Sequence, residues 1–183
     1  KELGVDQNTM LWFCSDNGPA RQNSPRHVGS AGHLSGYKLS FNEGGVRVPG
    51  LLVWPNGTDG PRTIDAPAIT TDYFPTILDA LDIPLSTDRD YGGTSLLPII
   101  RGQRDARDAT IGFLNRDGNE SAWVEDRYKL LIKRDGSGLY DILSDPGEKK
   151  DLTAQQPIIA ARMHAELSAW KADVMADLAA IPE

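Results

Sequence analysis

The sequence predicts an α/β fold followed by a smaller α+β subdomain, with the domains spanning residues 1–105 and 106–183. Two short apolar runs, 9–15 and 51–54, each end in turn residues, which is typical of buried strands. Beyond residue 106 the pattern changes to several short strands. From residue 157 onward one apolar stripe follows helical spacing. We therefore expect a four-stranded antiparallel sheet in the second part, with a long helix covering one of its faces.

The first apolar run breaks off at Asp16-Asn17-Gly18-Pro19. Asp16 and Asn17 then stand at the C-terminal end of a strand, where open α/β sheets place their ligands. A carboxylate oxygen beside an amide oxygen suits a hard cation, Ca²⁺ or Mg²⁺, better than zinc. The same residues are common in ordinary turns, so the pattern alone leaves a structural turn as the simpler alternative.

Lys38 lies between glycine-rich steps, with Gly36 before it and Glu43-Gly44-Gly45 after it. Glycine permits close backbone approach, so this loop can bring an ammonium group beside an anion, although an isolated lysine is usually a solvated surface group. We expect Glu43 and Arg47 to pair and to hold the loop in shape. His27 and His33 lie in the preceding loop, where solvent exposure is a simpler expectation than contact with a substrate.

Residues 70–72, Thr-Thr-Asp, are suited to capping a helix, and Pro75 is tolerated because it falls in the first turn. The expected helix packs through its apolar residues, and Asp79 and Asp82 form a solvated face. The apolar residues follow at helical spacing: Phe74, Ile77, Leu78 and Leu81.

Four short segments of the second part are candidate strands: 110–114, 122–125, 128–133 and 139–142. Asp126-Arg127 predicts a hairpin between the second and the third. Asp145-Pro146-Gly147 predicts a structural turn and not a metal site. The final helix carries an apolar stripe that is far more typical of core packing than of a cofactor site: Ile159, Met163, Leu167, Trp170, Val174, Leu178 and Ile181.

The composition excludes several classes of function. The 183 residues carry a formal net charge of −7, which argues against a nucleic-acid-binding surface. No apolar run approaches the length that spans a membrane. Cys14 is the only cysteine, so an internal disulfide cannot form, and its place in an apolar strand predicts a buried, unreactive thiol.

Several motifs together resemble the sulfatase family in identity, order and spacing: SDNGP at 15–19, GYK at 36–38, EGGVRVP at 43–49, WPNG at 54–57 and LYDILSDPGEKKDL at 139–152. The resemblance implies a formylglycine-dependent, arylsulfatase-like enzyme of the alkaline phosphatase superfamily. It also implies that residues 1–105 belong to the large mixed-sheet sulfatase domain, and that the chain is the C-terminal portion of a longer enzyme.

The resemblance assigns roles residue by residue. Asp16 and Asn17 correspond to calcium ligands and supply half of that site, with Mg²⁺ as the alternative ion. Lys38 corresponds to a sulfate-contacting, catalytic lysine, and His33 is a candidate substrate-binding residue. The substrate would be a sulfated small molecule or glycan, which needs local positive charge in a protein of negative net charge. A periplasmic or extracellular location is favoured by the resemblance alone.

The family's nucleophile is a formylglycine made in a C-x-P-x-R motif, or in the corresponding motif with serine. Neither the sequence around Cys14 nor Ser24-Pro25-Arg26 matches it, so we expect this polypeptide to be inactive by itself. A phosphate-ester hydrolase and a non-catalytic glycan-binding module remain the alternatives. The strands at 9–15 and 51–54 would have unpaired edges, which predicts self-association or disorder around residues 17–45.

Overall fold

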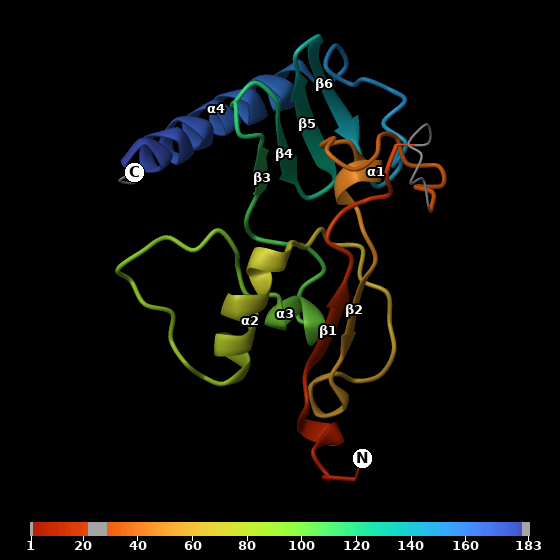
Figure 1. Cartoon of the computed structure of the whole chain (residues 1–183), viewed down its shortest axis with the longest axis vertical. Coiled ribbons are helices and arrows are strands. Elements are labelled where there is room, and N and C mark those ends of the chain that lie inside the picture. The colour runs from red at the N-terminus through yellow and green to blue at the C-terminus, as the bar shows by residue number, and fades with distance from the viewer. Residues whose placement is uncertain (1, 22–28, 181–183) are drawn as a thin grey trace. The chain divides into compact units, whose positions relative to one another are not determined.

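The computed structural model describes residues 2–21 and 29–180. Its elements form two compact units, residues 1–14 with 49–111 and residues 15–48 with 112–183 (Figure 1). This partition differs from a single boundary near residue 105, because the segment 15–48 packs with the C-terminal part of the chain. His27 and Ile181, which the sequence analysis singles out, lie outside the described residues.

The first unit contains a two-stranded antiparallel sheet and short helices. The two predicted strands are confirmed with slightly shifted ends, since β1 pairs directly with β2 and Trp12 lies opposite Leu52. The predicted helix is confirmed as α2, preceded by a 3-10 turn at the expected capping residues. The elements are η1 (Asp6–Asn8), β1 (Leu11–Cys14), β2 (Gly50–Val53), η2 (Pro55–Gly57), η3 (Thr70–Asp72), α2 (Tyr73–Ala80) and α3 (Leu97–Ile100).

One face of the β1–β2 pair packs on a small core. Trp12, Leu52 and Trp54 lie against the buried side chains of α3 and its neighbour: Leu96, Ile99 and Ile100. Cys14 is partly exposed, which differs from the fully buried thiol expected. The opposite face of the pair is apolar and more than half exposed at every position: Leu11, Phe13, Leu51 and Val53.

Asp72 links the start of α2 to the rest of the first unit. Its fully buried carboxylate accepts hydrogen bonds from the backbone nitrogens of Ile69 and Thr94, both at 2.9 Å, and forms an ion pair with Arg107. This bond spans the 3-10 turn η3 ahead of α2, whereas no side chain of residues 70–72 caps the first turn of α2 itself, which differs from the cap expected from the sequence. Because Arg107 lies 35 residues away, no local pattern predicts the ion pair.

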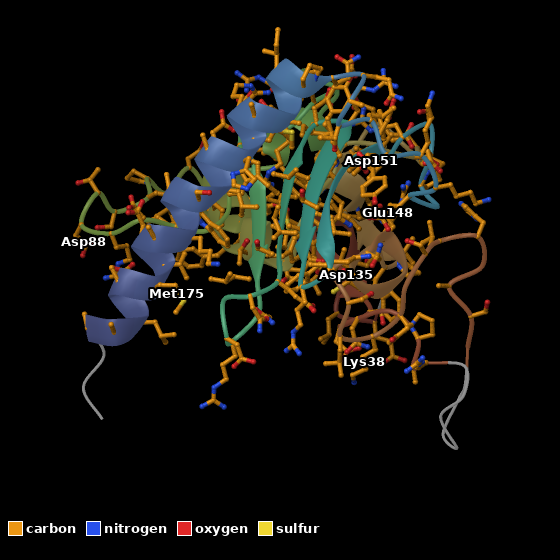
Figure 2. All side chains as sticks on the ribbon, turned by 90° about the horizontal axis from the view of Figure 1, so that it is seen from above. Lys38, Asp88, Asp135, Glu148, Asp151 and Met175 are labelled. Carbon is orange, nitrogen blue, oxygen red and sulfur yellow. The ribbon has the colours of Figure 1, made fainter. Side chains whose placement is uncertain are left out.

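The second unit is built on a four-stranded sheet in the order β3-β4-β5-β6, and the β4–β5 and β5–β6 pairs are antiparallel. Helix α4 lies along one face of this sheet (Figures 1 and 2). This confirms the predicted subdomain, including the hairpin at Asp126-Arg127. The elements are α1 (Glu43–Val46), β3 (Ile111–Leu114), β4 (Ser121–Glu125), β5 (Tyr128–Lys133), β6 (Gly136–Asp141) and α4 (Pro157–Ala180).

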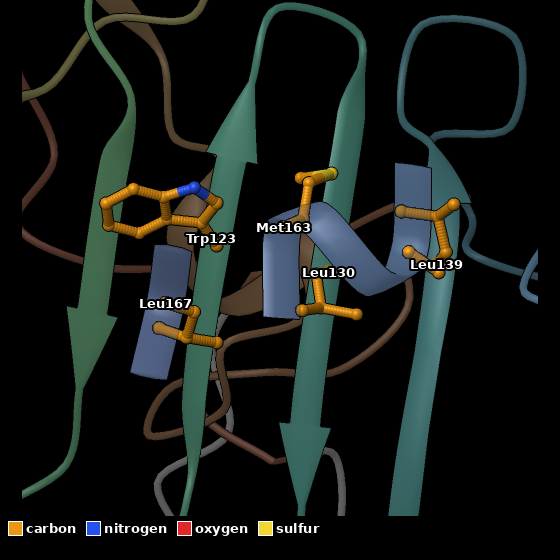
Figure 3. Close-up of a cluster of buried hydrophobic side chains, with 6 residues drawn as sticks. Trp123, Leu130, Leu139, Met163 and Leu167 are labelled. Carbon is orange, nitrogen blue, oxygen red and sulfur yellow. The ribbon is translucent and has the colours of Figure 1, made fainter. Parts of the chain in front are cut away.

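The main core of the second unit lies between the sheet and α4. Trp123, Leu130 and Leu139 are paired across β4, β5 and β6 and therefore form one row on the same face of the sheet. Met163 and Leu167 of α4 pack onto this row (Figure 3). Burying these apolar side chains is the main reason that the helix stays on the sheet.

The apolar stripe of α4 is buried only in its first two thirds. Trp170 packs against the core, and a Cβ at Gly112 would lie 2.6 Å from its ring, so β3 needs a glycine there. Leu178, by contrast, is 52% exposed. The periodicity predicts the helix correctly, but the far end of the stripe is only partly covered.

Asp141 is the last residue of β6, and its carboxyl group makes the stability of the fold depend on pH. Burial alone would raise the pKa of Asp141, but hydrogen bonds from Arg127 and Ser144 outweigh burial and hold the pKa below its usual range. A carboxyl group whose pKa is lower in the folded protein than in the unfolded chain stabilises the fold. This stabilisation is fully present above the unfolded-state pKa of about 3.9, and it is lost as the pH falls through the folded-state pKa.

We therefore expect the free energy of unfolding to decline as the pH falls below about 5, and expect Asp141→Asn to flatten part of this decline. Urea unfolding at a series of pH values measures it. Asp173→Asn, on the exposed side of α4, is the matched control and should leave the profile unchanged. An unaltered slope in Asp141→Asn would contradict the assignment.

Candidate functional site

Asp16 and Asn17 lie in the loop that follows β1. The backbone nitrogen of Asn17 donates to Asp16 Oδ1 at 3.0 Å, and Asn17 Nδ2 donates to the carbonyl oxygen of Gly18 at 2.9 Å. Ser15 Oγ closes the turn by donating to the carbonyl oxygen of Asn17 at 3.0 Å. Since the amide nitrogen of Asn17 faces the backbone, its Oδ1 is the atom left to meet a cation, next to the exposed Asp16 carboxylate.

A backbone contact holds the Asp16–Asn17 loop against α1. The nitrogen of Gly18 donates to the carbonyl oxygen of Gly45 at 2.9 Å. A Cβ at Gly18 would lie 1.8 Å from the carbonyl oxygen of Gly44, and Gly44 itself has no room for one beside Ser35. The glycines of the EGG motif therefore serve this close approach.

The segment 36–42, here called the lysine loop, is joined to the same structure. The backbone nitrogen of Lys38 donates to the carbonyl oxygen of Pro19 at 2.8 Å. Ser40 Oγ accepts from the nitrogen of Tyr37 at 3.1 Å and donates to its carbonyl oxygen at 2.8 Å, which fixes the turn around Lys38. The Lys38 side chain is exposed (Figure 2). The hydrogen bond from Lys38 thus connects the lysine loop to Pro19, two residues after Asn17.

A second cation lies against Tyr37, the residue before Lys38. The Arg21 guanidinium sits over the ring of Tyr37, 5.5 Å from its centroid. The sequence analysis missed Arg21, because nothing in its neighbours marks it. His33 is exposed, and its main chain lies close to Gly147. A substrate contact by its side chain stays a prediction.

The sequence analysis also missed a buried charge cluster behind the lysine loop. Glu43 pairs with Arg47 at 3.6 Å, as expected, but its shorter contact is with Lys129 Nζ at 2.8 Å. Glu148 of the predicted turn lies 3.1 Å from the same nitrogen. One sequence signal for this cluster exists, namely a lysine placed inside the apolar strand 128–133.

The donor set fits a hard cation only in part. Ca²⁺ takes six to eight oxygen ligands, and Asp16 with Asn17 supplies a fraction of them. Within residues 2–21 and 29–180, no three histidine, cysteine, aspartate or glutamate side chains gather as a metal site. The roles of Asp16, Asn17 and Lys38 therefore stay predictions. In the same described ranges, no helix has both the length and the apolar character required to cross a membrane.

Comparisons with known proteins point to one family. Residues 1–83 match the family model described as Sulfatase. The chain is 34% identical to human steryl-sulfatase over 128 residues, which cover 67% of this chain and 22% of that protein. It is also 34% identical to mouse N-acetylgalactosamine-6-sulfatase over 105 residues, covering 56% of this chain and 20% of the relative.

A similar solved structure is Ps i-CgsB in complex with k-i-k-neocarrahexaose, with 25% sequence identity and a TM-score of 0.76. The similarity covers 91% of this chain and 37% of that one. The chain spans between about a fifth and a third of the length of the curated relatives that it matches. Family model, relatives and solved structures agree, and the chain belongs to the sulfatase family.

Proposed function

We propose that the protein containing this chain hydrolyses sulfate esters, with Asp16 and Asn17 as Ca²⁺ ligands and Lys38 at the sulfate. The observation that carries the proposal is the hydrogen bond from the Lys38 nitrogen to the carbonyl oxygen of Pro19 at 2.8 Å. It joins the two loops that carry these residues, and both loops belong to one compact unit. Family membership supports the same reaction class.

Each side chain has a defined chemical task in this proposal. A bound Ca²⁺ supplies positive charge that neutralises the sulfuryl oxygens. Lys38 adds a mobile ammonium group that donates hydrogen bonds to a sulfate oxygen or to the departing alcohol oxygen. Local positive charge is needed because the chain carries a net charge of −7.

The nucleophile is not among these residues, because no C-x-P-x-R motif or serine counterpart occurs in the 183 residues. We therefore propose that this polypeptide alone turns over no sulfate ester. The substrate class is a sulfated small molecule or glycan. Human steryl-sulfatase and mouse N-acetylgalactosamine-6-sulfatase are each 34% identical to this chain and mouse steryl-sulfatase is 37% identical, differences too small to favour one substrate over the other.

The test uses the full-length protein with an aryl sulfate and the matching aryl phosphate. We expect sulfate to be the better substrate by at least about tenfold, a difference of roughly 1.4 kcal/mol in transition-state binding. A chelator should abolish turnover, and Ca²⁺ should restore it better than Mg²⁺. A preference for the phosphate ester would instead indicate a phosphate-ester hydrolase. Sugar binding in the presence of the chelator, with no turnover of either ester, would indicate a glycan-binding module.

Self-association, predicted from the unpaired strand edges, stays a prediction, and the exposed apolar face of β1 and β2 is a second surface that chains cover by pairing. Sedimentation of this polypeptide against its Phe13→Lys variant measures it. We expect the variant to shift the distribution toward monomer.

A further inference from the structure

The buried charge cluster of Glu43, Lys129 and Glu148 lies wholly inside the second unit. Lys129 Nζ, on β5, has no exposed surface and lies 2.8 Å from Glu43 Oε1 and 3.1 Å from Glu148 Oε1. The side chains of Glu43 and Glu148 are 4% and 1% exposed. Arg47 lies 3.6 Å from the second oxygen of Glu43, so two positive charges face two negative ones.

Overall stability does not account well for such a cluster. Charges removed from water lose hydration, and apolar side chains of similar size often stabilise a fold as well or better. A buried ion cluster is better suited to holding segments in one fixed arrangement, because its hydrogen bonds have directions that apolar contacts lack. The role of the cluster therefore follows from the segments that it holds together.

The cluster holds the two ends of the lysine loop. Glu148 Oε2 accepts hydrogen bonds from Asn42 Nδ2 at 2.8 Å and from the backbone nitrogen of Glu43 at 2.9 Å, and it also accepts one from Ser35 Oγ. Ser35 comes three residues before Lys38, and Asn42 comes four residues after it. One carboxylate from the turn after β6 thus anchors both sides of the turn that presents Lys38.

The same anchor reaches the Asp16–Asn17 loop through α1. Glu43 begins α1, and Gly45 of that helix accepts the hydrogen bond from Gly18. A chain of direct contacts therefore runs from Lys129 through Glu43 and Gly45 to the loop with the proposed metal ligands. We infer that Lys129 and Glu148 are positioning residues that fix the spacing between Lys38 and the Asp16–Asn17 pair; this inference rests on the proposed sulfatase function.

The experiment compares Lys129→Met with wild type in the full-length protein, well below the thermal midpoint of either. Hydrogen exchange of the peptides covering 16–20 and 35–47 reads the loops directly, without any activity. We expect exchange there to be at least tenfold faster in Lys129→Met. For an aryl sulfate, we expect kcat/KM to fall at least tenfold.

Leu139→Ala is the matched control. Leu139 is fully buried in the same sheet, but it lies in the row that packs on α4. We expect this variant to lower the thermal midpoint while exchange at 16–20 and 35–47, and kcat/KM, stay within twofold of wild type. Equal losses in Leu139→Ala and Lys129→Met would mean that Lys129 acts only through general stability, and would overturn the inference.

Glu148→Gln keeps the side-chain size and tests the same idea if Lys129→Met does not fold. We expect exchange to rise at 35–47 with a smaller loss of kcat/KM. Unchanged hydrogen exchange in both variants would overturn the inference. Faster exchange with unchanged kcat/KM would overturn it too, because the cluster would then hold the loop without positioning the site. If the wild-type full-length protein does not hydrolyse sulfate esters, the proposed function is wrong. The exchange rates alone then still test whether the buried charge cluster holds the two loops.

Discussion

Replacing Lys38 by methionine is expected to lower kcat/KM of the full-length protein for an aryl sulfate by about 10²–10³-fold, the usual cost of removing one donor from a site of developing charge. The side chain is exposed, and among the described residues the hydrogen bond of Lys38 is made by its backbone nitrogen to Pro19, so the substitution should leave folding unchanged. Steady-state kinetics together with a thermal melt measure both effects.

Two further variants make the Lys38 experiment specific. Lys133→Met removes an exposed lysine at the end of β5 and should leave kcat/KM within about twofold, since substitutions away from a site are usually silent. Lys38→Arg keeps the charge on a differently shaped group and should retain part of the activity. Full activity in Lys38→Met would remove the lysine from the proposed site.

Replacing Asp72 by alanine is expected to lower the free energy of unfolding by about 3–5 kcal/mol. Asp72 has no exposed surface, and the side chain of its partner Arg107 is 2% exposed. The substitution leaves a buried guanidinium without its counter-charge, and it also leaves the backbone nitrogens of Ile69 and Thr94 without their acceptor. Urea unfolding of the protein, followed by circular dichroism, measures the loss.

A double-mutant cycle separates the ion pair from the other contacts of Asp72. Because Asp72 and Arg107 are in contact, the double variant with Arg107→Met should lose less stability than the sum of the two single variants. Asp79→Asn, on the exposed side of α2, is the control and should stay within about 0.5 kcal/mol of wild type. Strictly additive losses would show that the pair contributes no coupling.

The elements that the sequence predicts well are those with a local signal. The hairpin at Asp126-Arg127 lies between two strand patterns, and the first turns of α4 place Met163 and Leu167 on the sheet as their spacing requires. The start of α2 directly after Thr70-Thr71-Asp72 also follows from residue type and position. Each of these signals is contained within a few residues, so the order of the chain carries it directly.

The features that the sequence does not predict depend on distant segments. Lys129 meets Glu43 across 86 positions of the chain, and Glu148 reaches the nitrogen of Glu43 across 105. The exposed end of the α4 stripe, at Leu178, depends on how far the sheet extends beneath it. Sequence periodicity carries no information about contacts between distant segments, so local patterns do not predict these features.

By itself, the sequence determined the family, the order of the six strands and the two longer helices, and the identity of the candidate side chains, because motifs and periodicity are properties of neighbouring residues. Only the tertiary structure decided that residues 15–48 pack with the C-terminal sheet, and that a buried lysine with two glutamates holds the lysine loop there. The physical reason is that a buried charge takes its partners from whatever the fold brings within about 3 Å, at any distance along the chain.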